Sequence, residues 1–395
     1  MNSIAVVTTI TVVLALLFDF TNGFHDAANA TSTVIATKSL KPRTAVIVSA
    51  IFNFLPAFVI GTAVANTISK TVDLDALPAV AAGAVPMGVR VALAALIGAI
   101  FWNLLTWSLG LPSSSSHAII GGLIGAGVAA AGVDAISTSS VTKTVIAIFA
   151  SPLIAFLVAL VASGLIKIIQ RVFHLDDNHE FFRWGQVFTS SFLSWGHGSN
   201  DAQKTMGIIA AALYSGGYLH ADDASKLHPS TWVIFAAHIA IALGTFYGGW
   251  RIIETMGLKL THITRASGMA ANLGAITSIN GATALGVPIS TTHAAASSVI
   301  GSGVGSGHKI HFGTIGRMVA AWIVTLPSAA IVGYVTLKAT TFDGALGYVI
   351  TAVLIIAVLA YGIRLMFTAT TAEDVERALP QDIDLLVPLE DRESA

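Results

Sequence analysis

The sequence predicts an all-α polytopic membrane protein built from two repeats that enter the membrane in opposite directions. Three observations lead to this fold class. Of the 395 residues, 54% are hydrophobic and 10% are charged, whereas a soluble domain carries about 25% charged residues. The mean hydropathy is +0.79, and apolar runs long enough to span a bilayer recur along the chain. Finally, two polar motifs each occur twice at nearly the same separation.

The composition excludes several classes of function. A chain so poor in charge cannot cover a water-facing surface, so a soluble enzyme is excluded. The net charge of −1 gives no indication of a nucleic-acid partner. Cysteine is absent, so no disulfide, thiolate metal site or cysteine nucleophile is available. The P-loop, nucleophile-elbow, zinc-protease and EF-hand motifs are absent as well.

Each span is expected to be a helix of about 20 residues, because lipid offers the backbone no hydrogen-bond partners. The first apolar run is interpreted as a span and not as a signal peptide, since Met1–Thr11 holds no Lys or Arg and no small-residue cleavage site follows. We expect about 10–12 membrane segments, some of them broken or re-entrant. The candidates are 3–20, 44–66, 89–109, 113–130, 141–167, 185–212 (broken), 231–250, 266–285, 287–304, 313–336 and 345–367.

Cationic residues in the loops predict the orientation, because Lys and Arg are enriched on the cytoplasmic side. Loops rich and poor in these residues alternate, and the rich ones are 38–43, 167–184, 251–265 and 305–317. We therefore expect the N-terminus outside and the C-terminus in the cytoplasm, in a multi-pass protein of the cell (inner) membrane. This alternation holds only if the second half of the chain enters the membrane opposite to the first.

An internal repeat supports that inversion. A motif of Gly, Pro, hydroxyl residues and His occurs at Gly110–Ala118 and again at Gly286–Ala294, 176 positions later. From residue 110 onward, eight of 18 paired positions are identical. A second motif, Gly23–Ala27 and Gly198–Ala202, recurs after 175 positions. Two motifs that each recur after almost the same number of residues indicate duplication. Together with the opposite entry directions, this pattern is typical of an inverted-repeat secondary transporter.

The repeat predicts how the chain is divided. We expect a first transmembrane repeat at 1–167, a cytoplasmic linker at 168–184 and a second, inverted transmembrane repeat at 185–336. An additional C-terminal membrane helix is expected within 337–371. The polar acidic tail at 372–395 is too polar and too interrupted by proline to span a bilayer.

The motifs at Pro112 and Pro288 predict helices that begin inside the membrane, because Pro fits a first helical turn and Ser or Thr fits its cap. The free N–H groups and positive dipole end of such a start form an anion site. Two of these starts face to face suit a tetrahedral oxyanion, with phosphate as the first candidate. The alternative is that the hydroxyl residues only pack against neighbouring helices. The expected substrate-binding residues are Ser114, Ser115, Ser116, Ser290, Thr291 and Thr292.

The second motif places carboxylates within expected spans, where each costs about 2.5–3.5 kcal/mol on insertion scales. Asp26 and Asn29 are three residues apart, as are Asp201 and Lys204, so each pair shares a helical face. Asp and Asn beside Gly are typical of a cation site, whereas Lys204 brings a positive charge of its own. We expect Lys204 to replace a bound metal ion, and Asp26, alone or with His25, to exchange protons. A structural ion pair between Asp201 and Lys204 is the alternative, and both can be true.

Several other polar residues lie within or next to the expected spans. Asp19 and Asn22 share one face of the first helix and either line the pathway or pack. His117 and His293 follow the hydroxyl clusters and are interpreted as helix-positioning donors, not as metal ligands. His238 stands alone in an apolar run, which is typical of a buried core histidine.

On these motifs the sequence resembles the inorganic phosphate transporter (Pit) family over nearly its whole length. The two Asp-centred motifs, the two Pro-x-Ser-[Ser/Thr]-[Ser/Thr]-His motifs and their placement in two halves carry the resemblance. The usual cation motif of the family is Asn-Asp-x-x-Asn in both halves. This sequence departs from it, with His-Asp-Ala-Ala-Asn at 25–29 and Asn-Asp-Ala-Gln-Lys at 200–204. These departures resemble the bacterial low-affinity, proton-coupled branch.

The resemblance implies a proton-coupled symporter that imports inorganic phosphate as a neutral complex with a divalent metal. It implies phosphate contacts at the six hydroxyl residues above and a coupling-ion region at Asp26, Asn29, Asp201 and Gln203. We expect this region to include His25, Asn22 and Lys204, and the transporter to work by alternating access. No cofactor is expected apart from the co-transported metal. Expected partners are phosphate, protons and the lipid bilayer, and a homodimer is left open.

Two related transporters remain as alternatives. The same scaffold would suit another oxyanion such as sulfate, and a sodium-coupled phosphate symporter would differ only in its driving ion. Two other classes are less well supported. A membrane enzyme acting on lipid phosphates needs a cluster of Arg, His or carboxylates near one interface, which the sequence does not show. A passive anion channel would not support uphill uptake.

Overall fold

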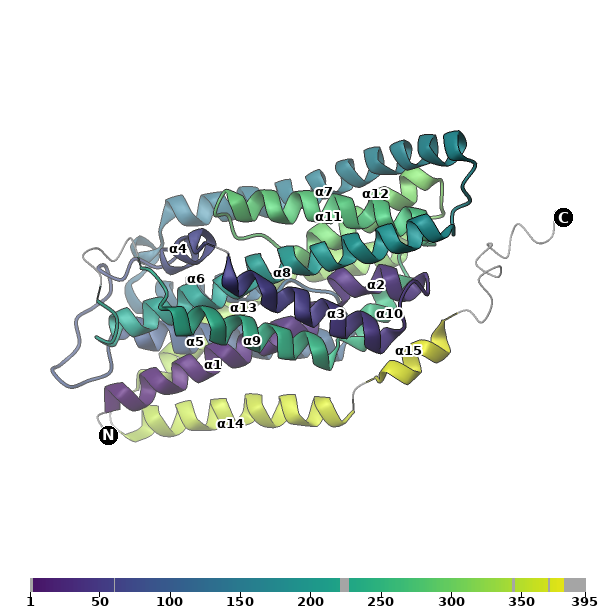
Figure 1. The fold of residues 1–395 in the computed structure, drawn as a ribbon. Helices are drawn as coiled ribbons and strands as arrows, with labels where there is room; N and C mark the ends of the chain where they lie inside the picture. Colours follow the sequence, from purple (N-terminus) through teal and green to yellow (C-terminus); the bar gives the residue numbers. More distant parts are fainter. Residues whose placement is uncertain (1–2, 60, 221–226, 343–344, 369, 380–395) are drawn as a thin grey trace.

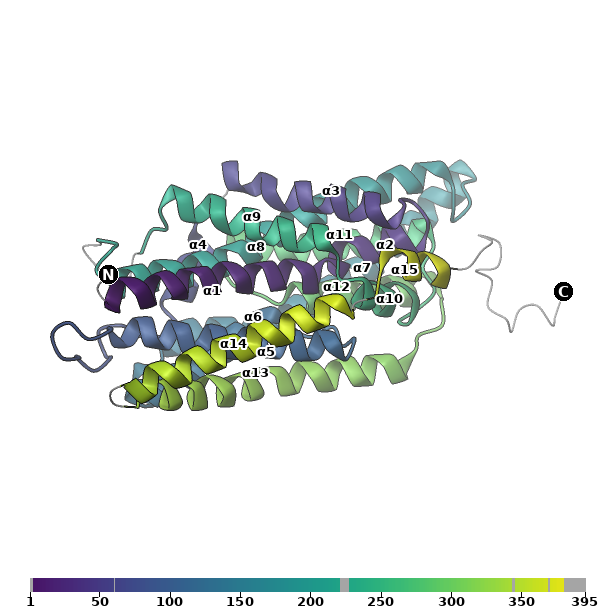
Figure 2. The ribbon, with the colours of Figure 1, turned by 90° about the horizontal axis from the view of Figure 1, so that it is seen from below.

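The computed structural model describes residues 3–379 except 60, 221–226, 343–344 and 369. Over these residues the chain forms helices, loops and two isolated β-bridges, and most long helices run along one common direction (Figures 1 and 2). The helices are α1 (Ser3–Asp26), α2 (Ala28–Ala36), α3 (Pro42–Phe54), η1 (Leu55–Phe58), α4 (Ala63–Ser69), α5 (Met87–Ser108), α6 (Ser115–Ala131), η2 (Val133–Ala135), α7 (Thr138–Phe173), α8 (Glu180–Ser215), α9 (Thr231–Tyr247), α10 (Trp250–Leu258), α11 (Arg265–Ala284), α12 (Thr291–Ser306), α13 (Phe312–Thr340), α14 (Ala345–Phe367) and α15 (Ala372–Ala378).

Within the described residues, five helical segments are long and apolar enough to cross a membrane: α1 with α2, α5, α7, α13 and α14. The number rises to seven when the bent pairs α3–α4 and α9–α10 each count as one span, the second pair being bent by 70°. The remaining segments α6, α8, α11 and α12 are shorter or more polar, and counting them brings the total into the expected range. The all-α polytopic fold class is confirmed.

Two expected spans differ from the observed helices. The segment 185–212 is not broken, because α8 continues from Glu180 to Ser215 without interruption. Its buried polar side chains find partners on other helices, so the backbone can stay helical. The segment 44–66, in contrast, is interrupted: α3 ends at Phe54 and α4 begins at Ala63. Pro56 lies in the 3₁₀ turn between them, where its missing N–H stops the α-helical ladder.

The first helix is longer than the sequence suggested. The expected span 3–20 continues to Asp26, turns at Ala27 and goes on as α2 to Ala36. Asp26 therefore lies at the end of one helix and next to the start of another. This break holds the Asp-centred motif at a point where its side chains reach several other helices.

One short helix from each half of the chain packs against a long helix of the other half. The short helix α6 lies against α13 of the second half, and α12 lies against α7 of the first. Glycines permit this approach: a Cβ at Gly125 would overlap the Ala330 carbonyl of α13, and one at Gly301 would overlap the Phe156 carbonyl of α7. Equivalent glycines thus make equivalent contacts, as duplication predicts. The opposite direction of the two repeats, and their boundaries, stay predictions.

The outer helices are suited to lipid. On α14, Gly347 and Val358 are buried, whereas most of the large apolar side chains of this helix are exposed. This helix lies outside the bundle beside α5 and α13 (Figure 2), within the region 337–371 where an additional membrane helix was expected. Of the predicted acidic tail, α15 is described, whereas 380–395 lies outside the described residues.

Candidate functional site

Each hydroxyl motif begins a helix, as predicted. Ser114 is the N-cap of α6, and its Oγ accepts a hydrogen bond from the His117 backbone N–H at 3.1 Å. Ser290 caps α12 in the same way, accepting from the His293 N–H at 3.2 Å. A cap of this kind satisfies one of the four free N–H groups of a helix start. The others remain available to an anion.

The two motifs meet inside the molecule. The Ser116 Oγ donates to the Ile289 carbonyl at 2.7 Å, so one motif bonds directly to the backbone of the other. The rings of His117 and His293 lie edge to face with centroids 4.5 Å apart. All six predicted substrate-binding residues are buried, with at most 2% of each exposed. The structure therefore brings together the two hydroxyl clusters that the sequence paired, while their contact with phosphate stays a prediction.

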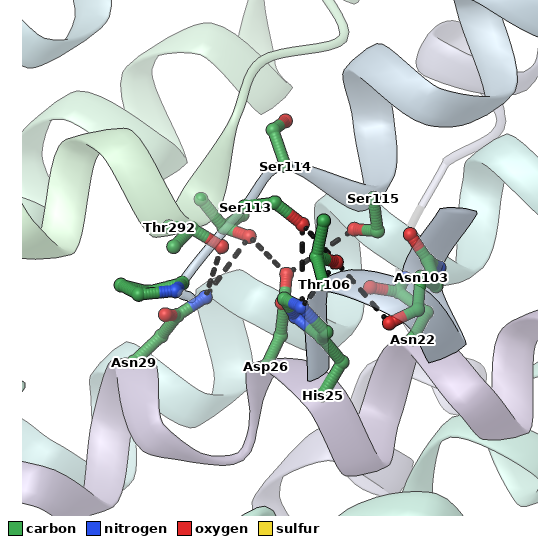
Figure 3. Close-up of polar contacts among 12 residues, drawn as sticks. Asn22, His25, Asp26, Asn29, Asn103, Thr106, Ser113, Ser114, Ser115 and Thr292 are labelled. Atoms are coloured by element: carbon green, nitrogen blue, oxygen red, sulfur yellow. Dashed lines mark hydrogen bonds and ion pairs between the residues drawn. The ribbon is translucent and has the colours of Figure 1, made fainter. Parts of the chain in front are cut away.

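Asp26 connects both hydroxyl motifs (Figure 3). Its Oδ2 accepts hydrogen bonds from Ser115 at 3.2 Å and from Thr291 at 3.3 Å. Its Oδ1 lies 2.6 Å from Nδ1 of His25, and both side chains are buried. Hydroxyl groups from the two halves thus converge on one carboxylate.

The neighbours of Asp26 extend this network. The Asn29 amide donates to the hydroxyls of Thr291 and Thr292, each at 3.3 Å. On the other side, Nε2 of His25 lies 3.3 Å from the Ser113 Oγ. Figure 3 shows Asn29 directed toward Thr292 and His25 toward the chain before α6. The first Asp-centred motif therefore touches the start of both α6 and α12.

Lys204 is fully buried on α8 and joins the second Asp-centred motif to both hydroxyl motifs. Its ammonium donates to the Asp201 carboxylate, to the Ser116 Oγ and, at 2.9 Å, to the Ile289 carbonyl. These three acceptors use the three donors of the ammonium. The ion pair with Asp201 is present; that the ammonium replaces a metal ion stays a prediction.

The Asp201 carboxylate contacts three further polar side chains. Its Oδ2 accepts from Thr291 at 3.1 Å and from Asn22 at 3.3 Å, and lies 3.3 Å from Nε2 of His197. Ligand atoms of Asp26, His197 and Asp201 all lie within 4.8 Å of one another. Sequence reasoning left His197 out, although its place four residues before Asp201 puts both on one helical face.

Gln203 lies apart from this cluster. Its Oε1 accepts the N–H groups of Val64 at 2.9 Å and of Ala65 at 3.4 Å, in the first turn of α4. Its amide nitrogen donates to the Ser199 carbonyl at 2.7 Å. In the structure Gln203 therefore caps a helix of the first half, and a part in ion coupling stays a prediction.

Three other histidines, His117, His238 and His293, are buried. His238 is buried, with Nδ1 2.9 Å from the Ile234 carbonyl, which fits a core histidine. The ring of His293 stacks on Trp322 with centroids 4.0 Å apart. Both ring nitrogens of His117 and Nε2 of His293 have no hydrogen-bond partner among the described residues. Ring packing, more than hydrogen bonding, accounts for the contacts of this pair.

Several known proteins are similar to this chain over most of its length. A profile of the phosphate transporter family matches residues 22–333. A protein of Bacillus subtilis (strain 168), named "Probable low-affinity inorganic phosphate transporter", is 42% identical over 341 residues, which cover 84% of this chain and 97% of that protein. A protein of the same name from Mycobacterium leprae (strain TN) is 45% identical over 332 residues, covering 83% and 76% of the two chains.

A solved structure described as "The sodium-dependent phosphate transporter" has the same fold, with a TM-score of 0.72 over 84% of this chain and 98% of that one. Its sequence is 23% identical, so the likeness concerns the fold alone. The family match and the curated relatives confirm a transporter and not an enzyme. From the match over residues 22–333 and the identity to curated relatives, the chain belongs to the phosphate transporter family.

Proposed function

We propose that the protein is a proton-coupled symporter that imports inorganic phosphate across the cell (inner) membrane by alternating access. One observation carries the proposal: the Thr291 hydroxyl, in the first turn of α12, lies within hydrogen-bond distance of both Asp26 and Asp201. Anion-binding groups and titratable carboxylates thus share a single buried site. The names of the curated relatives support phosphate as the substrate and transport with low affinity for it.

Phosphate binding would draw on the two helix starts. Backbone N–H groups at the start of α6 and α12 and the six hydroxyl groups offer donors without a fixed positive charge on those helices. Because these donors are neutral, the anion is held weakly enough to be released on the far side. Because the site is fully buried in this conformation, transport requires movements that open it to each side in turn.

Proton coupling follows from the hydrogen bonds of Asp26. Ser115 and Thr291 now donate to its carboxylate. When these hydroxyls turn to phosphate, Asp26 loses both donors and faces a second negative charge. A proton on Asp26 removes that repulsion. Phosphate and the proton therefore favour each other's binding, which is what a symporter requires.

The proposed cargo is phosphate together with a divalent metal. Hydrogen phosphate and a divalent cation form a complex without net charge, which avoids much of the cost of moving an ion through a low-dielectric region. The carboxylates of Asp26 and Asp201 and the ring of His197, whose ligand atoms lie within 4.8 Å of one another, offer hard oxygen and imidazole ligands beside the hydroxyl groups. The metal travels as substrate and is not a resident cofactor.

A sodium-coupled phosphate symporter is the second candidate, because the solved structure that shares this fold is described as sodium-dependent. Lys204 favours protons instead. Its ammonium lies between Asp201, Ser116 and the Ile289 carbonyl, where it would repel a cation that binds the second Asp-centred motif without phosphate, whereas a metal in a complex with phosphate brings no net charge. An N-terminus outside and a C-terminus in the cytoplasm complete the proposal, as the loop charges predict.

The test is phosphate uptake into proteoliposomes in which the proton, sodium and magnesium gradients are varied separately. We expect accumulation above equilibrium with an inward proton gradient, stimulation by magnesium, and no response to sodium alone. Excess sulfate should leave the uptake of labelled phosphate unchanged. Accumulation driven by sodium without a proton gradient would replace the proposal with the second candidate. Movement only down the phosphate gradient would indicate a channel.

A further inference from the structure

Asp19 is a buried carboxylate that the proposed mechanism does not use. It lies on α1 two helical turns before Asp26, and none of its surface is exposed. Neither carboxylate oxygen has a hydrogen-bond partner among the described residues. An ionised carboxylate without partners in a dry interior is strongly disfavoured, and such groups neutralise instead.

The polar groups around Asp19 share this feature. The Asn22 Oδ1, the Thr205 Oγ1 and both polar side-chain atoms of Asn103 are buried and have no partner among the described residues. Asn22 and Thr205 are among the groups that interact with Asp19, and Asn103 lies one helical turn before Thr106, whose hydroxyl is 2.7 Å from the Ser113 Oγ. Three helices, α1, α5 and α8, thus bring unpaired polar atoms to one region next to the candidate phosphate site.

The charges that act on Asp19 come from α8. Asp201 and Lys204 both interact with it, but Lys204 is already paired with Asp201. No charged group of α5 is among the groups that act on Asp19 within the described residues. The helix α9 packs along α1 and brings His238, whose Nδ1 bonds within its own helix. Lys204 thus balances one of the two carboxylates, and the charge of Asp19 remains uncompensated.

We propose that Asp19 is a proton-binding site of the coupling mechanism, separate from the phosphate-contacting Asp26, and that it is protonated in the conformation seen here. The inference rests on the proposed proton symport. The carboxylate takes up one proton on the outer side, and the neutral acid donates its O–H to one of the unpaired oxygen atoms nearby. The proton leaves when the inward-open state exposes Asp19 to water. A proton needs no shell of ligands, and the Lys204 ammonium disfavours a second fixed cation.

The experiment uses the full-length protein in proteoliposomes and compares Asp19→Asn, Asp19→Glu and the exposed control Asp134→Asn with the wild type. Two readouts separate binding from coupling. Exchange of labelled for unlabelled phosphate at equal pH on both sides requires binding and reorientation, without net proton movement. Accumulation driven by an imposed inward proton gradient requires the proton site as well.

We expect Asp19→Asn to keep exchange within about threefold of the wild type, since Asn resembles the protonated acid, and to lose at least tenfold of proton-driven accumulation. Exchange by the wild type should decline at alkaline pH, where Asp19 loses its proton, and this decline should be absent in Asp19→Asn. Asp19→Glu should keep measurable proton-driven accumulation, and Asp134→Asn should match the wild type in both readouts.

Proton-driven accumulation by Asp19→Asn at the wild-type level would overturn the inference and leave the proposed symport standing. Loss of exchange in both Asp19→Asn and Asp19→Glu would overturn it too, because that result indicates a structural role. Sodium-driven accumulation that Asp19→Asn abolishes would make the site a sodium site. A wild-type protein without any phosphate exchange would instead overturn the proposed function and, with it, this inference.

Discussion

His117 and His293 touch edge to face, with ring centroids 4.5 Å apart. They occupy equivalent positions of two motifs that lie 176 positions apart in the chain. Two copies of one residue can touch only near the axis that relates the copies. The two copies of the motif therefore meet beside the candidate phosphate site, which is where the predicted inverted repeat would place a substrate.

The close packing of α6 on α13 predicts the effect of adding a side chain at a glycine in this contact. Gly125→Ala places a Cβ against the Ala330 carbonyl, whose position is fixed by the α13 backbone. We expect the free energy of unfolding to fall by about 1–3 kcal/mol, as for other overpacked cores. The measurement is the thermal unfolding midpoint of the detergent-solubilised protein.

Gly164→Ala on α7 is the matched control, because nothing lies within 4 Å of the added Cβ. Removing a glycine from a helix stabilises it by about 1 kcal/mol, so this variant should unfold at an equal or higher temperature. A Gly125→Ala protein as stable as Gly164→Ala would contradict the close packing of α6 on α13.

The buried ammonium predicts a change of coupling ion. Lys204→Asn removes the charge that neutralises Asp201 and restores an amide of the kind found at position 29. Breaking a buried pair leaves an uncompensated charge at a cost of about 3–5 kcal/mol, so a cation becomes favourable beside Asp201. We expect phosphate uptake by this variant to become sodium-dependent. Uptake with unchanged proton coupling would refute the role given to Lys204.

The sequence predicted the helix starts at Ser114 and Ser290 because caps and prolines act locally. It also paired the two motifs, because duplication is visible in the residue types. It did not predict that α8 stays continuous, since the partners that satisfy Asn200, such as Thr283, lie 83 positions away. Nor could it show that Gln203 caps α4, whereas the next residue, Lys204, contacts both hydroxyl motifs. Side-chain direction depends on packing that a motif does not encode.

The polar linker predicts a pH-dependent contribution to stability. The exposed Glu180 binds Arg183 at 3.1 Å and Arg265 at 2.9 Å, tying the start of α8 to the start of α11. The hydrogen bond from Arg183, with the nearby charges of both arginines, lowers the pKa of Glu180 below its ordinary value. A lowered pKa stabilises the fold above the ordinary Glu range, and this stabilisation is lost as the pH falls through the lowered value.

Glu180→Gln should therefore lower the unfolding midpoint slightly at pH 7, by little because the pair is exposed and screened. The difference from the wild type should shrink as the pH falls below the ordinary glutamate range and grow at low ionic strength. Glu376→Gln, on the exposed face of α15, is the control. A difference that persists unchanged at acid pH would contradict the ion-pair explanation.

Removing one hydroxyl donor should weaken phosphate binding. Thr291→Val keeps the shape of the side chain but removes the O–H that now reaches both carboxylates. A hydrogen bond to a charged group contributes about 1.5–3 kcal/mol, so we expect the KM for phosphate to rise roughly tenfold to a hundredfold. Thr277→Val, exposed on α11, is the matched control. An unchanged KM in Thr291→Val would remove this hydroxyl from the phosphate site.

Asp26 allows the sharpest test of coupling, because it accepts bonds from both hydroxyl motifs and lies 2.6 Å from a histidine nitrogen. Asp26→Asn keeps the size of the side chain but cannot take up a proton, so proton-linked phosphate uptake should be abolished. Membrane insertion should remain intact, because a neutral amide is less costly inside the bilayer than a carboxylate. The yield of membrane-inserted protein and proton-driven uptake are measured together. Wild-type uptake by Asp26→Asn would mean that phosphate and proton do not meet at this residue, and the coupling proposed here would have to run through another carboxylate.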